Sequence, residues 1–209
     1  MQGYLSVSGE LVTEKVIEKS RFIATSRHVE GEEQARAFVA EISQKYMDAT
    51  HNCYAYIADD IGNFMRFSDY GEPQGTAGMP MLEVIKANNL RQTAVVVTRY
   101  FGGIKLGAGG LVRAYSGSVA ENLAGAVRVS YQPCAESQYI VDYPYIDALN
   151  RFFGENDCMI IGVSYADRVI FSVAVKKEAE QAFDSALVNR LNGRVNIVKK
   201  REYLYPFSL

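Results

Sequence analysis

Two glycine-rich segments carry the groups that could do chemistry. In the second, residues 102–110, Lys105 is flanked along the chain by Arg99 and Arg113, and residues 99–113 contain no acidic side chain. Glycine lets the backbone approach a ligand closely, and amides at a helix start attract anions. The pattern predicts a site for nucleic acid or another anion, made of Arg99, Tyr100, Gly102, Gly103, Lys105, Gly107, Gly109, Gly110 and Arg113.

A structural interpretation of the same segment stays open. The glycines could simply allow a tight crossing from a strand to a helix, and the known phosphate fingerprints do not fit. No Lys-Ser or Lys-Thr pair follows the glycines as Walker A requires, and Val112 stands where G-x-G-x-x-G needs its third glycine. We therefore assign no cofactor.

The first glycine-rich segment, residues 68–78, contains two carboxylates. Asp69 and Glu72 could act as an acid–base pair or hold Mg²⁺. We favour local roles, in which Asp69 forms an Asx-turn and Thr76 caps the next helix. The carboxylates could also pair with Arg99 and Arg113, which would explain the cationic residues without any ligand.

Other candidate side chains surround these segments. His51 and Cys53 could be a general base and a nucleophile, but with no obvious third member we favour a hydrogen-bonded histidine and an inert buried thiol. Tyr100 and Phe101 could stack on a base or belong to the core. The expected supporting polar residues are Arg21, His51, Ser68, Asp69, Glu72 and Thr76.

Metal and hydrolase motifs do not fit this chain. Three widely spaced cysteines and two histidines form no zinc pattern, and the odd cysteine count is typical of reduced thiols in a cytoplasmic protein. Ser116 has no G-x-S-x-G context. We assign neither a metal site nor a catalytic residue.

The predicted elements that position these residues fall into two groups. Before residue 133 we expect strands at about 10–30, 53–58, 64–68 and 93–98, and helices at 31–47, about 76–87 and 111–125. The run TAVVVT (93–98) predicts a strand buried on both faces. After it, strands at 136–143, 158–167, 168–176 and 194–205 and helices at 144–153 and 178–191 give the order β-α-β-β-α-β, which is ferredoxin-like. We predict an α+β protein with domains 1–132 and 133–209.

Charge excludes binding of polyanions by the whole surface. The chain has 22 basic and 24 acidic residues. Residues 1–133 hold 13 and 14 of these and residues 134–209 hold 9 and 10, so each part has a net charge of −1. An RNA-binding role must therefore come from a local patch. No apolar run is long enough to span a bilayer, so we expect no membrane partner.

Taken together, the two glycine-rich segments resemble a known family. SDYGEPQGTAGMPML and VVVTRYFGGIKLGAGGLVRAYS, with KSRFIA (19–24) and ATHNCYAY (49–56), look like the signature of the IMPACT family in its bacterial YigZ-like form. The resemblance implies an N-terminal domain with the ribosomal protein S5 domain 2-like fold and a ferredoxin-like C-terminal domain. These folds are similar to domains IV and V of elongation factor G. We expect the motif positions, Tyr115 among them, to meet on one surface.

The resemblance also implies a link to translation regulation. Eukaryotic members bind a ribosome-associated activator of a translation-control kinase, and bacterial members are proposed to bind nucleic acid or ribosomes. Three hypotheses follow: a module that binds RNA or the ribosome, a regulator that binds a translation-factor protein, and an enzyme acting on a small phosphorylated or acyl substrate between the two loops. We rank them in that order.

Overall fold

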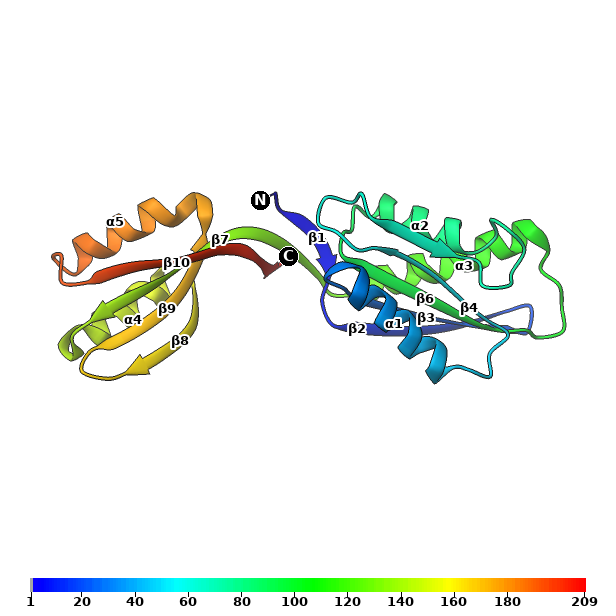
Figure 1. Ribbon diagram of the computed structural model, residues 1–209, viewed down its shortest axis with the longest axis horizontal. Helices are drawn as coiled ribbons and strands as arrows, with labels where there is room; N and C mark the ends of the chain where they lie inside the picture. The colour runs from blue at the N-terminus through cyan, green and yellow to red at the C-terminus, as the bar shows by residue number, and fades with distance from the viewer. Residues whose placement is uncertain (1) are drawn as a thin grey trace. The chain divides into compact units, whose positions relative to one another are not determined.

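The computed structural model describes residues 2–209, apart from the side chain of Ser208. The chain divides into two compact units (Figure 1). The N-terminal unit is Tyr4–Ser130 with Phe207–Leu209, and the C-terminal unit consists mainly of residues 131–206. Both contain helices and a sheet, so the predicted α+β class is confirmed.

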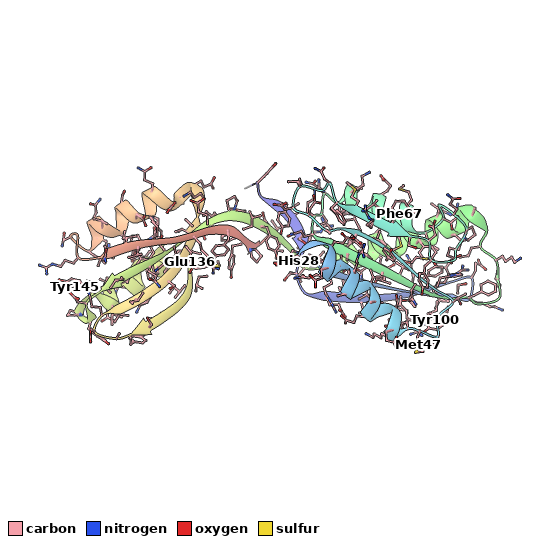
Figure 2. The ribbon with its side chains drawn as sticks, viewed as in Figure 1. His28, Met47, Phe67, Tyr100, Glu136 and Tyr145 are labelled. Carbon is pink, nitrogen blue, oxygen red and sulfur yellow. The ribbon has the colours of Figure 1, made fainter. Side chains whose placement is uncertain are left out.

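The N-terminal unit is built on an antiparallel sheet with strand order β2-β3-β6-β4-β5. His28 and Tyr100 lie at opposite ends of this sheet (Figure 2). The elements of the unit are β1 (Tyr4–Val7), β2 (Glu10–Ile17), β3 (Ser20–His28), α1 (Gly31–Lys45), β4 (His51–Ile57), β5 (Met65–Ser68), α2 (Gly78–Ala87), β6 (Thr93–Tyr100) and α3 (Gly107–Gly125).

Helices cover both faces of this sheet, α1 on one and α2 with α3 on the other (Figure 1). The central strand β6 packs Ala94 and Val96 with α1, and Val95 and Val97 with α2 and α3. Alternate side chains of a strand point to opposite faces. The prediction of a strand buried on both faces is thus confirmed, and it explains the continuous apolar run.

Two elements differ from the sequence-based prediction. The expected helix 111–125 begins at Gly107, so Gly107, Gly109 and Gly110 form its first turn rather than a loop. Because glycine has a low helix propensity, the sequence pattern indicated a loop where the first turn of α3 lies. Strand β1 was also not predicted; only four residues long, it is held partly by a hydrogen bond from Arg91 N to the Leu5 carbonyl.

The C-terminal unit shows the predicted order β-α-β-β-α-β. In its sheet, β7 pairs with β9 and β10, β8 pairs with β9, and β1 also pairs with β7. Strand β7 begins three residues before the division between the units. The hydrophobic core of the C-terminal unit contains Tyr139, Leu149, Phe153, Phe171 and Leu187. The elements are β7 (Arg128–Val141), α4 (Ile146–Glu155), β8 (Met159–Tyr165), β9 (Val169–Lys176), α5 (Glu180–Arg190) and β10 (Asn196–Ser208), with short 3₁₀ turns at Tyr143–Tyr145 and Lys177–Ala179.

Candidate functional site

The site lies at one end of the sheet, where β3, β4 and β6 place three side chains in a row. Arg99 on β6 is opposite Phe22 on β3 and His51 on β4. Phe22 belongs to the core beneath α2 and α3, so the row faces those helices. Arg99 is therefore only 4% exposed, although it is charged.

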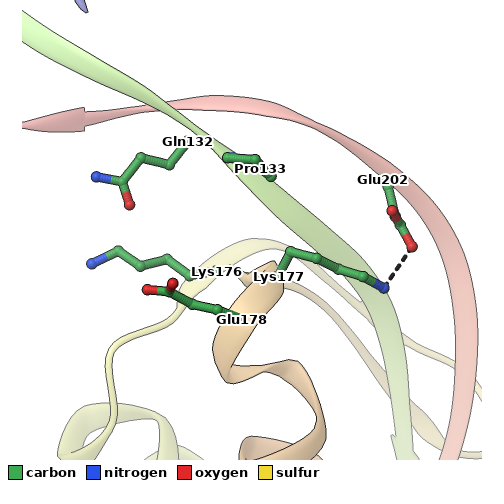
Figure 3. A pocket seen from close by; sticks show the side chains of 6 residues that line it. All are labelled: Gln132, Pro133, Lys176, Lys177, Glu178 and Glu202. Carbon is green, nitrogen blue, oxygen red and sulfur yellow. Dashed lines mark ion pairs between the residues drawn. The ribbon is translucent and has the colours of Figure 1, made fainter. Parts of the chain in front are cut away.

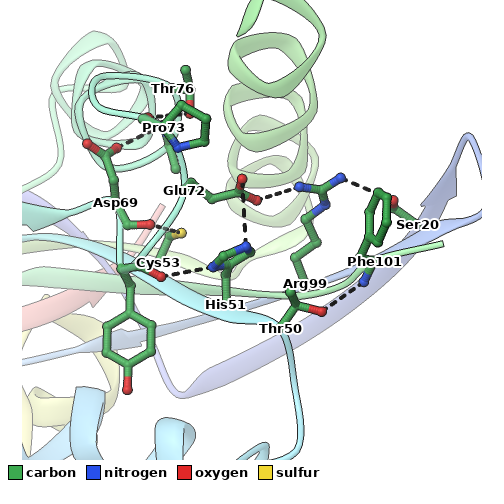
Figure 4. Close-up of polar contacts among 12 residues, drawn as sticks. Ser20, Thr50, His51, Cys53, Asp69, Glu72, Pro73, Thr76, Arg99 and Phe101 are labelled. Atoms are coloured by element: carbon green, nitrogen blue, oxygen red, sulfur yellow. Dashed lines mark hydrogen bonds and ion pairs between the residues drawn. The ribbon is translucent and has the colours of Figure 1, made fainter. Parts of the chain in front are cut away.

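Glu72, in the loop before α2, neutralises this buried cation. Its Oε1 lies 2.6 Å from Arg99 Nη1 (Figure 4). The same oxygen accepts a 2.8 Å hydrogen bond from the Tyr115 hydroxyl. Its Oε2 lies 3.8 Å from His51 Nε2. Burial raises the pKa of Tyr115, which keeps the hydroxyl as a donor to the carboxylate. Glu72 is thus already engaged by three side chains.

The pairing of Arg99 with Glu72 is one of the alternatives that the sequence left open, and the structure shows it. The corresponding pairing of Arg113 is absent, because no carboxylate lies within 4 Å of Arg113 among the described residues. Tyr115 can reach Glu72 because it lies on the same buried face of α3 as Leu111. A polar hydroxyl on an apolar helical face could have revealed the role of Tyr115 from sequence.

Asp69 organises the first glycine-rich segment through backbone hydrogen bonds. Its carboxylate accepts from the amides of Gly75, Ala77 and Gly78 at 2.8–3.0 Å. These amides lie at and before the start of α2, where a negative charge is favoured. The predicted Asx-turn is therefore wrong: Asp69 binds backbone amides of its own loop, but these lie six to nine residues ahead along the chain.

The expected helix cap by Thr76 is wrong. Its hydroxyl donates 2.6 Å to the Pro73 carbonyl, and α2 has no side-chain cap. Asp69 already occupies the amides that a cap would bind. Ser68 has a similarly local role, because its hydroxyl accepts a hydrogen bond from the Tyr70 amide.

Ser20, which lies in the KSRFIA segment but is not among the predicted site residues, links the second glycine-rich segment to the β2–β3 turn. Its hydroxyl accepts from Gly102 N at 3.2 Å and from Arg99 Nη2 at 3.3 Å. A Cβ on Gly102 would overlap the backbone of Lys19. Gly102 is therefore needed for close approach, whereas Gly103 and Gly107 adopt positive φ.

His51 and Cys53 are held by the first segment. The Cys53 thiol is buried and donates to the Asp69 carbonyl, and burial raises its pKa to about 12. His51 Nδ1 lies 3.0 Å from the Tyr70 carbonyl, which can only accept. This arrangement favours the interpretation of an inert thiol and a hydrogen-bonded histidine.

The expected single surface divides into two. Arg21 and Tyr100 lie on the face of the sheet opposite Arg99 and His51, because neighbouring strand residues alternate. Arg21 binds Glu14 through two hydrogen bonds of 2.6 and 2.8 Å and lies over the Tyr100 ring. The Tyr100 hydroxyl donates to Asp48.

Lys105 and Arg113 remain as exposed cations beside the start of α3. Neither has a carboxylate within 4 Å in the described part of the chain. Together they line a hollow that Glu18 also borders. The first turn of α3 has no acidic residue and no side-chain cap. We call Lys105, Arg113 and residues 107–110 the cationic tip.

Within residues 2–209, no group of three or more His, Cys, Asp or Glu side chains is placed to hold a metal ion. In the same range, no helix is both long and apolar enough to cross a membrane.

Comparison with known proteins identifies the family. Residues 18–123 match the Impact N-terminal domain, and residues 140–194 match a domain of unknown function (DUF1949). The chain is 38% identical to the IMPACT family member YvyE of Bacillus subtilis (strain 168), over 98% of this chain and 94% of that protein. The chain belongs to the IMPACT family.

Other IMPACT family relatives also match along nearly the whole chain. The Escherichia coli (strain K12) member YigZ is 33% identical over 97% of this chain and 100% of its own length. A solved structure, titled as the crystal structure of a hypothetical protein, is 33% identical with a TM-score of 0.63 and covers 96% of this chain and 98% of that one. The Impact N-terminal domain contains every candidate site residue named above.

The close approach at Gly102 yields a first prediction. Gly102→Ala should lower the free energy of unfolding of the N-terminal unit, since its Cβ meets rigid backbone. Gly109→Ala is the matched control: its Cβ has room, and alanine in a helix is favoured over glycine by up to about 1 kcal/mol. Amide hydrogen exchange of β6 measures both changes, and equal effects would contradict the assigned role.

The buried ion pair yields a second prediction. Glu72→Ala leaves the Arg99 charge buried and uncompensated, so we expect a loss of about 3–5 kcal/mol in the free energy of unfolding. Glu14→Ala removes an exposed pair, which water and salt screen, and should lower the free energy of unfolding far less. The same hydrogen-exchange experiment compares them. A Glu72 variant as stable as the Glu14 variant would disprove the role of Glu72.

The Cys53 thiol yields a third prediction. The thiolate is the reactive form, and a pKa near 12 leaves little of it at pH 8. Iodoacetamide at pH 8 should therefore leave Cys53 unmodified in the folded protein and modify it after denaturation, as mass spectrometry can measure. Fast modification of the folded protein that His51→Ala slows would instead indicate a histidine-activated nucleophile.

Proposed function

We propose that this protein binds RNA, free or within the ribosome, through the cationic tip. The observation that carries the proposal is that Lys105 and Arg113 stand exposed beside uncapped helix amides, with no carboxylate within 4 Å in the described residues. Phosphate is favoured at such a place by the amides and by the side-chain charges.

The contrast with the other candidate cations supports the choice of residues. Arg99 and Arg21 are both predicted site residues. Arg99 forms an ion pair with Glu72, and Arg21 forms one with Glu14. They position the segment rather than offer charge to a ligand. Arg99, Tyr100 and the polar loop residues then act as support, and a phosphate meets Lys105, Arg113 and the amides of Gly107, Gly109 and Gly110.

We also propose the finer fold assignments and the domain boundary. The order β-α-β-β-α-β with sheet order β10-β7-β9-β8 supports a ferredoxin-like C-terminal domain. The N-terminal domain is S5 domain 2-like, with the boundary at 132/133. Likeness of these domains to domains V and IV of elongation factor G would place the protein in the cytoplasm as a regulator of translation.

A translation-factor protein is the second candidate partner. The exposed Phe101 and Ile104 beside the cationic tip would suit a protein contact. Capture from lysate with and without nuclease separates the two candidates, because binding through RNA is lost after nuclease treatment and direct protein binding is not.

Charge reversal at the tip tests the RNA proposal. Lys105→Glu with Arg113→Glu should abolish or strongly weaken binding to single-stranded RNA, measured by fluorescence anisotropy at several salt concentrations. Each lost phosphate contact lowers the salt slope by about 0.7 for single strands, so the slope should fall by about 1.4. Arg151→Glu with Lys200→Glu is the matched control, since both residues are exposed and lie in the C-terminal unit. Equal affinity of the two double variants would overturn the proposal.

A further inference from the structure

A pocket of about 360 Å³ opens beside the cationic tip, between the two glycine-rich segments. Pro73, Phe101 and Leu111 supply its apolar part. Arg99 and Glu72 line it as a buried ion pair, so exposed Lys105 supplies its unpaired positive charge. The start of α3 forms one border. Small-molecule pockets are about 300–1,000 Å³ and mostly apolar with a few polar groups, so this pocket has the size and lining of a small binding site.

Phe101 is a fixed aromatic surface at this pocket. The residue is 46% exposed and lines the pocket. The Arg99 guanidinium lies over the ring, 5.4 Å from its centre, and the Phe101 amide donates 3.0 Å to the Thr50 hydroxyl. One ring face is therefore supported by Arg99, and the exposed part can accept a flat ligand ring.

An anion is favoured at the other side of the same pocket. Gly107 and Ala108 are the first residues of α3, which has no side-chain cap, and exposed Lys105 lies next to them. Arg99, only 4% exposed, lines the pocket too, and its Nε has no hydrogen-bond partner in the described residues. The buried guanidinium thus retains an unused donor.

One hollow of the C-terminal unit offers no such pairing of an aromatic ring with an anion site. It is about 380 Å³ and is lined by Gln132, Pro133, Lys176, Lys177, Glu178 and Glu202 (Figure 3). Lys177 pairs with Glu180 and Glu202, and Lys176 pairs with Asp157. Both lysines of this hollow are therefore paired with carboxylates.

We infer that the pocket beside α3 binds one nucleotide, with the base stacked on Phe101 and the phosphate at the amides of Gly107 and Ala108 next to Lys105. This inference rests on the proposed RNA binding and specifies its chemistry: the tip holds one unstacked base of a single strand or of a strand end. A free nucleotide has the same chemistry, so the two sources must be distinguished by experiment.

Two variants test the pocket without disturbing the fold. Phe101→Leu removes the stacking surface, and Phe67→Leu is its control, because Phe67 is 41% exposed on β5. Ala108→Asp places a carboxylate in the first turn of α3, which favours the helix but repels phosphate. Amide NMR spectra of each variant verify that it is folded.

Binding is measured with AMP, adenosine, inorganic phosphate and a single-stranded oligoadenylate, by NMR titration and anisotropy. Stacking contributes about 1–3 kcal/mol per base. Phe101→Leu should therefore lower the affinity for AMP and oligoadenylate at least about fivefold and leave the affinity for phosphate nearly unchanged. Ala108→Asp should lower the affinity for AMP, phosphate and oligoadenylate, but not the affinity for adenosine. AMP binding as tight as oligoadenylate binding indicates a free nucleotide as the ligand, and much tighter oligoadenylate binding indicates RNA.

Different results would disprove the nucleotide pocket and the RNA proposal. If Phe101→Leu and Ala108→Asp bind AMP and oligoadenylate like the unmodified protein while reversal of Lys105 and Arg113 abolishes oligoadenylate binding, the nucleotide pocket is wrong and the RNA proposal stands. If neither AMP nor oligoadenylate binds the unmodified protein, both are wrong.

Discussion

The rest of the site depends on the buried ion pair between Arg99 and Glu72. Removing two charges from water is costly unless they are closely paired and hydrogen-bonded. Here the Tyr115 hydroxyl and Ser20 supply additional hydrogen bonds. The pair joins strand β6 to the loop before α2, and Tyr115 adds α3. Three segments far apart in the sequence are thereby held in one arrangement.

This arrangement separates the charges at the tip of the sheet into two kinds. Arg99 and Glu72 cancel each other inside the protein, whereas Lys105 and Arg113 stay exposed beside the uncapped start of α3. A chain with a net charge of −2 can thus present a local positive surface. The proposed RNA binding through so small a surface would gain specificity from the shape of the pocket and from Phe101 more than from total charge.

The glycines serve this geometry in different ways. Gly102 lets the second segment lie directly against the β2–β3 turn, and Gly107 takes a positive φ as α3 begins. Asp69 binds the amides near the start of α2 and so rigidifies the first segment. The two segments then face each other across the pocket with their backbones fixed.

Hydrophobic patterning by itself determined much of the order of helices and strands in this protein. TAVVVT specified the doubly covered strand, and the alternating segments after residue 133 specified the β-α-β-β-α-β order, because burial of apolar faces dictates these patterns. The motif residues also indicated the family. Tertiary structure alone decided which arginine is neutralised, where α3 starts and what Asp69 binds. These depend on strand register and on contacts between segments distant in sequence, which local patterns do not encode.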